Sequence, residues 1–232
     1  MKSSKNTRKG FTLIELLAVI AIIGVLAGLV SQAIPAAFGA VRRMSASNNL
    51  RQIATAIVSY NQGGGASGRV IKDGSEPKSG KASSVAEFAE VLARSQGLTD
   101  AAVWYIESDD ALEDVTEFPR TVLSETTDGS NEMQNVKPAS WAVVVNAKRS
   151  PKDSTRYPIA WLRGLETSGE WKDDAPFGSS HGIMAFADGH IESPENLLQD
   201  ETKLRSSDGK NDTSSYQEAI GDNATVLEDT TN

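Results

Sequence analysis

One long apolar run near the amino terminus constrains this chain more than any other feature. From Phe11 to Val41 the only ionisable side chain is Glu15, and Leu16 to Val30 contains no polar side chain. A helix rises 1.5 Å per residue, so about 20 apolar residues cross the roughly 30 Å hydrocarbon core of a bilayer. The run from Phe11 to Val30 therefore predicts a membrane-spanning helix.

The ten residues before this run predict its orientation. Lys2, Lys5, Arg8 and Lys9 carry positive charge, and none of the ten is acidic. Basic residues next to a span favour the cytoplasmic side. We therefore expect a cytoplasmic amino terminus, a single pass through the membrane, and a carboxy-terminal domain outside the cytoplasm.

The position of Gly10 predicts an unusual cleavage. In an ordinary secretory signal the small-residue cleavage site follows the apolar part, whereas Gly10 precedes it. Cleavage after Gly10 would remove only the basic leader and leave Phe11 as the new amino terminus of the helix. Small-residue sites between Ala33 and Ala40 keep a conventional signal peptide open as the alternative.

Glu15 needs a partner because a carboxylate near the bilayer interior costs roughly 2.5 to 3.5 kcal/mol on insertion scales. The span offers no Lys, Arg or His to pair with it. Cleavage would create an ammonium group at Phe11, about one helical turn from Glu15. The same ammonium on a neighbouring subunit is the other candidate, and in that case Glu15 would set the stagger between chains.

The run from Lys9 to Leu17, KGFTLIELL, resembles the class III signal of type IV pilins and type II secretion pseudopilins. The resemblance implies that a prepilin peptidase cuts between Gly10 and Phe11 and methylates the Phe11 amine. It implies that Glu15 acts in subunit recruitment and stacking. It also implies a helical homo-oligomeric filament, with other pseudopilins and an inner-membrane assembly platform as partners.

The resemblance makes a pseudopilin of a type II secretion or related type IV filament system the expected function. Such a subunit, anchored in the inner membrane, would polymerise into a periplasmic pseudopilus that supports protein export. One alternative is a type IV pilin of a surface filament for adhesion, motility or DNA uptake. The other is a membrane-anchored domain that does not polymerise.

Charge and cysteine content help to choose among these functions. Removing the four leader cations from the formal charge of -8 leaves -12, which argues against a nucleic-acid surface. The chain has no cysteine, so no disulfide or thiolate site can form. Many type IV pilins close a carboxy-terminal loop with a disulfide, and its absence favours a pseudopilin.

The pattern along the chain predicts an α+β, pilin-like fold of one long helix on a small antiparallel sheet. We expect a leader at 1–10 and a helix at 11–62, transmembrane over 11–33 and amphipathic over 34–62. A globular domain at 63–200 and a polar, acidic tail at 201–232 follow. Within the globular domain, a capping box opens a helix at 84–95, and a short helix is expected at 193–198. Strands are expected at 102–106, 141–146 and 157–162, with a hairpin over 183–191.

Both histidines fall near this hairpin. His181, Asp188 and His190 could suggest a metal or acid-base site, but a tight turn at Asp188-Gly189 favours a structural hairpin instead. Ser179 and Ser180 precede His181, yet adjacency in sequence is not the geometry of a catalytic triad. The sequence therefore predicts no enzyme.

Calcium is the one cofactor that the composition suggests. Asp208, Asn211 and Asp212 offer the hard oxygen ligands that calcium prefers, although their spacing is not that of an EF-hand. The alternative for this segment is a solvated acidic tail.

Overall fold

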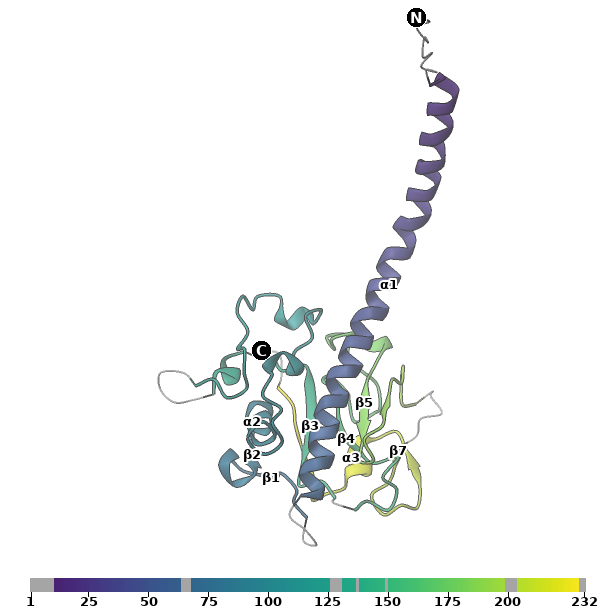
Figure 1. Ribbon diagram of the computed structural model, residues 1–232. Helices are drawn as coiled ribbons and strands as arrows, with labels where there is room; N and C mark the ends of the chain where they lie inside the picture. The colour runs from purple at the N-terminus through teal and green to yellow at the C-terminus, as the bar shows by residue number, and fades with distance from the viewer. Residues whose placement is uncertain are drawn as a thin grey trace, which may run out of the picture. The chain divides into compact units, whose positions relative to one another are not determined.

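The computed structural model describes residues 11–63, 68–125, 131–136, 138–148, 150–198 and 204–229. The chain divides into two compact units, Met1–Arg43 and Met44–Asn232. Helix α1, Leu13–Gln62, contributes to both units. The expected α+β fold, with one long helix and a small antiparallel sheet, is confirmed (Figure 1).

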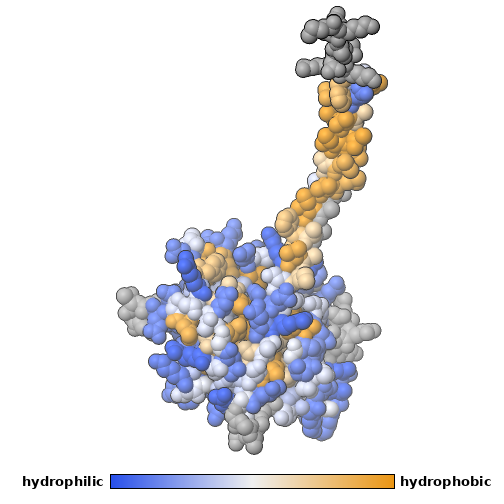
Figure 2. Space-filling model, viewed as in Figure 1, coloured by the Kyte–Doolittle hydropathy of each residue, from blue (hydrophilic) through white to orange (hydrophobic). Residues whose placement is uncertain are grey.

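The first part of α1 exposes its apolar side chains. Every large apolar side chain from Phe11 to Val30 is exposed. Figure 2 shows this stretch as a nearly continuous hydrophobic surface. The segment Leu13–Ser31 is long and apolar enough to cross a membrane, and none of it is buried within the chain. Its surface is therefore suited to contact with lipid or with other apolar helices.

The last part of α1 is amphipathic. Most of its buried side chains recur at three- and four-residue spacing, and all of them join the hydrophobic core of the globular unit. They are Ala46, Leu50, Ile53, Ala54, Ala56, Ile57 and Tyr60. Between them Arg51, Gln52 and Thr55 remain exposed. This period is that of a helix with one face on a core, as the sequence predicts.

Helix α2, Val85–Gln96, begins and ends at the residues that its caps predict. The Ser84 side chain accepts a hydrogen bond from the Glu87 amide at 3.2 Å. Gly97 ends the helix with a φ of 76°, and its amide donates to the Ala93 carbonyl. Glycine adopts this left-handed conformation without a Cβ clash.

A five-stranded antiparallel sheet forms the centre of the globular unit, in the order β6-β5-β4-β3-β9. Its strands are β3 (Trp141–Val145), β4 (Pro158–Leu162), β5 (Met184–Phe186), β6 (Ile191–Glu192) and β9 (Thr225–Leu227). All residues of β3, β4 and β5 are buried, so both faces of the central strands are covered. The expected strands at 141–146 and 157–162 and the 183–191 hairpin are confirmed.

The remaining elements are short. Parallel strands β1 (Lys72–Asp73) and β2 (Lys81–Ala82) pair with each other, as do antiparallel β7 (Leu204–Arg205) and β8 (Asp212–Thr213). Single turns of 3-10 helix are η2 (Pro77–Ser79), η3 (Ala101–Trp104), η4 (Asp110–Leu112), η5 (Glu132–Asn135) and η6 (Gly178–Ser180). Helix α3 is Tyr216–Ile220.

Two predicted elements are wrong. The strand expected at 102–106 is instead helix η3, because Asp100 caps it by accepting the Ala102 amide at 3.0 Å. The segment 193–198, expected to be helical, is irregular and ends in a turn, where the Asn196 side chain accepts the Leu198 amide at 2.7 Å. In both places a short polar side chain bonds to the nearby backbone and competes with the regular element.

The polar segment after residue 200, expected to be a tail, contributes a strand to the sheet of the globular unit. Strand β9 pairs with β3, with Val143 opposite Leu227. Leu204, Ala219, Ile220 and Leu227 are buried. These few apolar residues hold the segment on the core, although its average composition is that of a solvated tail.

Candidate functional site

The start of α1 forms a reciprocal capping box between Thr12 and Glu15. The Thr12 amide and the Thr12 hydroxyl donate to Glu15 Oε2 at 2.9 and 2.7 Å. In return, the Glu15 amide donates to Thr12 Oγ1 at 3.3 Å. Such a box satisfies backbone donors that the first turn of a helix leaves without partners. The sequence analysis missed this role, although the signal Thr-x-x-Glu is plain.

The capping box fixes the Glu15 carboxylate at the amino-terminal end of the helix. Both bonds from Thr12 end on Oε2, and Oε1 accepts no hydrogen bond within the described part of the chain. Phe11 is 80% exposed. Gly10 lies outside the described residues, so cleavage at this bond and the pairing of Glu15 with a Phe11 ammonium stay predictions.

His190 stabilises the β5–β6 hairpin. Its Nδ1 lies 2.5 Å from Asp188 Oδ1, and its Nε2 lies 3.2 Å from Glu192 Oε1. The ring stacks on Phe186 at 4.5 Å between centroids. Burial raises the pKa of Asp188, but the hydrogen bonds and charge of His190 outweigh burial and hold this pKa below its ordinary value. Each nitrogen thus faces a different carboxylate.

His181 lies apart from that arrangement in the chain, as the residue after η6. Within the described residues no group of three or more His, Cys, Asp or Glu side chains could hold a metal ion. The structural hairpin predicted for this region is confirmed by the pairing of β5 with β6.

The residues predicted to bind calcium lie in and beside the β7–β8 turn. Asp208 Oδ1 accepts the Ser206 hydroxyl at 2.7 Å and the Lys210 amide at 3.0 Å. These two hydrogen bonds lower the pKa of Asp208. The Asn211 carbonyl accepts the Ser206 amide at 2.9 Å.

Asp212 differs from Asp208 because it meets cations. Its Oδ1 lies 3.0 Å from Arg156 Nη1 and 3.2 Å from Arg205 Nη1. A calcium ion held by Asp208, Asn211 and Asp212 would compete with both guanidinium groups. The calcium site stays a prediction.

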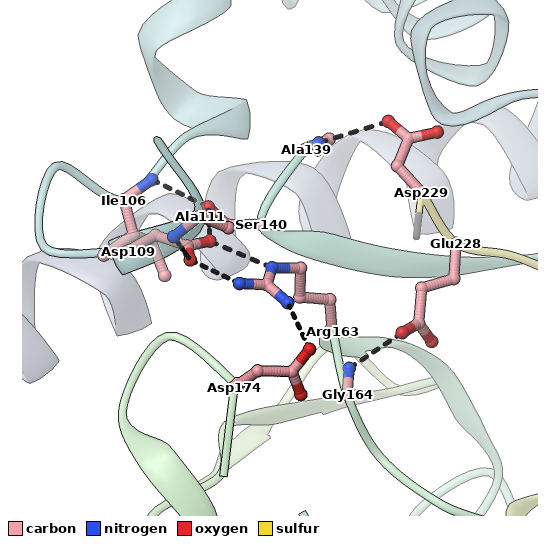
Figure 3. Close-up of polar contacts among 10 residues, drawn as sticks. All are labelled: Ile106, Asp109, Ala111, Ala139, Ser140, Arg163, Gly164, Asp174, Glu228 and Asp229. Carbon is pink, nitrogen blue, oxygen red and sulfur yellow. Dashed lines mark hydrogen bonds and ion pairs between the residues drawn. The ribbon is translucent and has the colours of Figure 1, made fainter. Parts of the chain in front are cut away.

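A buried polar cluster, which the sequence analysis did not predict, links a loop to the sheet (Figure 3). Arg163, directly after β4, forms a double hydrogen bond to Asp109, with Nε 3.0 Å from Oδ2 and Nη2 on Oδ1. The Ser140 hydroxyl, directly before β3, donates to Asp109 Oδ2 at 3.0 Å. Asp109 and Arg163 are each 2% exposed and Ser140 is fully buried. Asp109 and Arg163 are 54 positions apart, so no local pattern could reveal the pair.

Glu228 and Asp229, directly after β9, border this cluster. The Gly164 amide donates to Glu228 Oε1 at 2.8 Å, and the Ala139 amide donates to Asp229 Oδ2 at 3.1 Å. Burial raises the pKa of Glu228, although the Gly164 bond opposes this effect. These hydrogen bonds link the residues after β9 to Ala139, which precedes β3, and to Gly164, which follows β4.

Comparison with known proteins identifies the amino-terminal region. Residues 5–31 match the family model described as the prokaryotic N-terminal methylation motif. No curated protein and no solved structure matches the chain.

The chain therefore carries the class III prepilin signal of type IV pilins and pseudopilins. Together with the α+β fold, this motif supports a type IV pilin-like subunit. Such subunits are structural and non-enzymatic. The apolar helix and the signal also indicate anchoring in a membrane.

Proposed function

We propose that this protein is a pseudopilin, a structural subunit of a type II secretion or related type IV filament system. A prepilin peptidase cuts between Gly10 and Phe11 and methylates the Phe11 amine. The mature subunit leaves the inner membrane to join a periplasmic filament that supports protein export. The proposal rests on the methylation motif over residues 5–31 and on the large apolar side chains from Phe11 to Val30, which are all exposed.

The proposed mechanism is packing and electrostatics without catalytic turnover. Apolar helices of successive subunits bundle along the filament axis and replace the lipid that surrounded each one. The Phe11 ammonium of one subunit meets the Glu15 carboxylate of the same or the next subunit. Because an unpaired charge in an apolar bundle is costly, staggers that separate these two groups are disfavoured.

The absence of cysteine favours a pseudopilin over a disulfide-closed surface pilin. In this chain the carboxy-terminal segment is held instead by β9 pairing and by the contacts of Glu228 and Asp229. Imaging of cells would separate the two: a pseudopilin forms no long extracellular filament at native expression. Glu15 favours a subunit of the filament shaft, because minor tip subunits often lack an acid at this position.

Mass spectrometry of the protein purified from membranes tests the proposal. We expect an amino terminus at Phe11 with a methylated amine. An intact Met1, or a terminus after Ala33, would refute processing by a prepilin peptidase. Deleting the peptidase is the matched control, and should leave the leader in place.

A further inference from the structure

A groove runs between the exposed face of α1 and the end of α2. Its volume is about 570 Å³, and its lining includes Asn48, Arg51, Gln52, Thr55 and Ser59 of α1 together with Gly97. All of these residues belong to the globular unit. We name this feature the α1 groove. Ala56 and Leu98 add apolar surface to these hydrogen-bonding side chains, and Arg51 is the one charged residue in the lining.

The helix that lines the groove is positively charged. From Leu16 to Gln62 it carries Arg42, Arg43 and Arg51 and no acid, although the chain as a whole has 31 acids and 23 bases. Arg51 is exposed and forms no ion pair within the part of the chain that the structure describes. The groove therefore presents an unpaired guanidinium to an anionic partner.

A loop of the same unit has the complementary charge. The acidic loop, Glu107–Glu117, carries six carboxylates and no basic residue. Five of the six are exposed and form no ion pair among the described residues; they are Glu107, Asp110, Glu113, Asp114 and Glu117. Exposed acids elsewhere, such as Glu76 and Glu125, do lie within 4 Å of a base.

The sixth carboxylate anchors the acidic loop to the sheet. Asp109 is buried against Arg163 and Ser140, and it also accepts the Ala111 amide at 3.1 Å at the start of η4. The Ile106 amide donates to Ser140 Oγ at 3.0 Å. A loop held in this way loses little conformational entropy on binding, which favours its use as a contact surface.

We propose that the acidic loop of one copy docks in the α1 groove of a neighbouring copy. Charge complementarity selects a second copy as the partner, because one chain supplies both surfaces. The two surfaces differ, so the contact is heterologous, and a heterologous contact that does not close into a ring extends as a helical filament. This inference rests on the proposed filament function and names a contact between its globular units.

Disulfide crosslinking tests the contact directly, because the natural chain has no cysteine. Full-length Gln52→Cys and Asp114→Cys chains are expressed together in cells that contain the proposed filament system. The cells are then treated with an oxidant that forms disulfides. We expect a mixed disulfide dimer at a yield about tenfold above that of Gln52→Cys with Asp222→Cys, whose cysteine is also exposed but lies outside the acidic loop. Equal yields from the two pairs would overturn the proposal.

Charge reversal provides a second test of the docking contact. Introducing Arg51→Glu into the Gln52→Cys chain should lower the dimer yield about fivefold, and Asp110→Arg with Glu113→Arg in the partner chain should restore it. Lys72→Glu is the matched control, since Lys72 is exposed on β1 and lies outside the groove. No loss with Arg51→Glu, or no recovery with the double reversal, would overturn the docking contact.

A Val19→Cys chain separates this inference from the proposed function. Its cysteine lies in the apolar segment, so its self-crosslinking reports helix bundling without reference to the groove. Val19→Cys dimers without Gln52→Cys/Asp114→Cys dimers would refute the docking contact alone. Loss of both would refute filament assembly and the contact together.

Discussion

The hydroxyl of Thr12 donates a 2.7 Å hydrogen bond to Glu15 Oε2, and the Glu15 amide donates back to the same hydroxyl. The acid that stands alone in the apolar run thus has a partner within its own first helical turn. This geometry orients the carboxylate toward the helix amino terminus, where the Phe11 ammonium would appear after cleavage. Thr12 is therefore a positioning residue for the proposed Phe11–Glu15 pair.

Thr12→Ala should loosen the start of α1. Loss of a capping side chain costs about 1 kcal/mol, which corresponds to roughly fivefold faster opening of the first turn. Hydrogen exchange of the amides of residues 13–16 in detergent micelles measures this change. Thr12→Ser keeps the hydroxyl and should exchange like the natural chain; if Thr12→Ala also exchanges like the natural chain, the capping box has no energetic role.

Glu15→Leu should leave leader cleavage intact and impair assembly. The substitution makes insertion of the helix easier but leaves the Phe11 ammonium without its carboxylate, so we expect crosslinked oligomers to fall about tenfold or more. Chemical crosslinking of cells that express each variant measures the oligomer pattern. An unchanged pattern would favour the alternative of an anchored domain that does not polymerise.

Asp109→Ala should destabilise the globular unit by about 3 to 5 kcal/mol, because it leaves the buried Arg163 guanidinium unpaired. Denaturant unfolding of the full chain in detergent, followed by tryptophan fluorescence, measures the free energy. Asp109→Leu combined with Arg163→Met should recover much of the loss, since removing both charges leaves neither unpaired.

Arg94→Ala is the control for this experiment. Its ion pair with Glu90 is a partly exposed i,i+4 contact, which is worth at most about 1 kcal/mol. A loss for Asp109→Ala as small as that for Arg94→Ala would contradict a structural role for the buried pair.

Glu228 predicts a pH dependence of stability. Burial raises its folded-state pKa above the ordinary value of 4.5, so its contribution to stability is full below that value and is lost as pH rises through the folded-state pKa. Glu228→Gln keeps an acceptor for the Gly164 amide and removes this loss. Its stability relative to the natural chain should therefore increase as pH rises from about 4 toward neutrality, measured by thermal unfolding.

The direction in which stability changes with pH distinguishes Glu228 from Asp188. Asp188, whose pKa is lowered, would contribute the opposite trend, because its contribution is lost as pH falls. A difference between Glu228→Gln and the natural chain that does not change with pH would contradict the assignment to Glu228.

The predicted calcium site gives a further test. Calcium held by Asp208, Asn211 and Asp212 should raise the unfolding temperature relative to a chelator, because a ligand of the native state stabilises it. Asp208→Asn should abolish the increase, and magnesium serves as the control ion. Equal unfolding temperatures with calcium and with chelator would leave these residues as the turn and ion-pair groups described above.

The amino-acid sequence by itself determined the elements whose signals are local. The apolar run, the basic leader and the motif around Gly10 and Glu15 are contiguous, so the long helix and its signal could be predicted without a tertiary structure. The caps of α2 and the Asp188-Gly189 turn are likewise short patterns of residues that bond to their own neighbours. Strands β3 and β4 were predictable because they are continuous apolar runs.

Only the tertiary structure decided which distant segments meet. Asp109 and Arg163 form an ion pair across 54 positions, and β9 joins β3 at the edge of the sheet from a segment with the composition of a tail. Neither pairing produces a periodic pattern in the sequence. Burial of a single carboxylate or of a three-residue strand depends on the atoms packed around it. The long helix follows from local chemistry, whereas the positions of the acidic loop and of β9 follow from long-range packing.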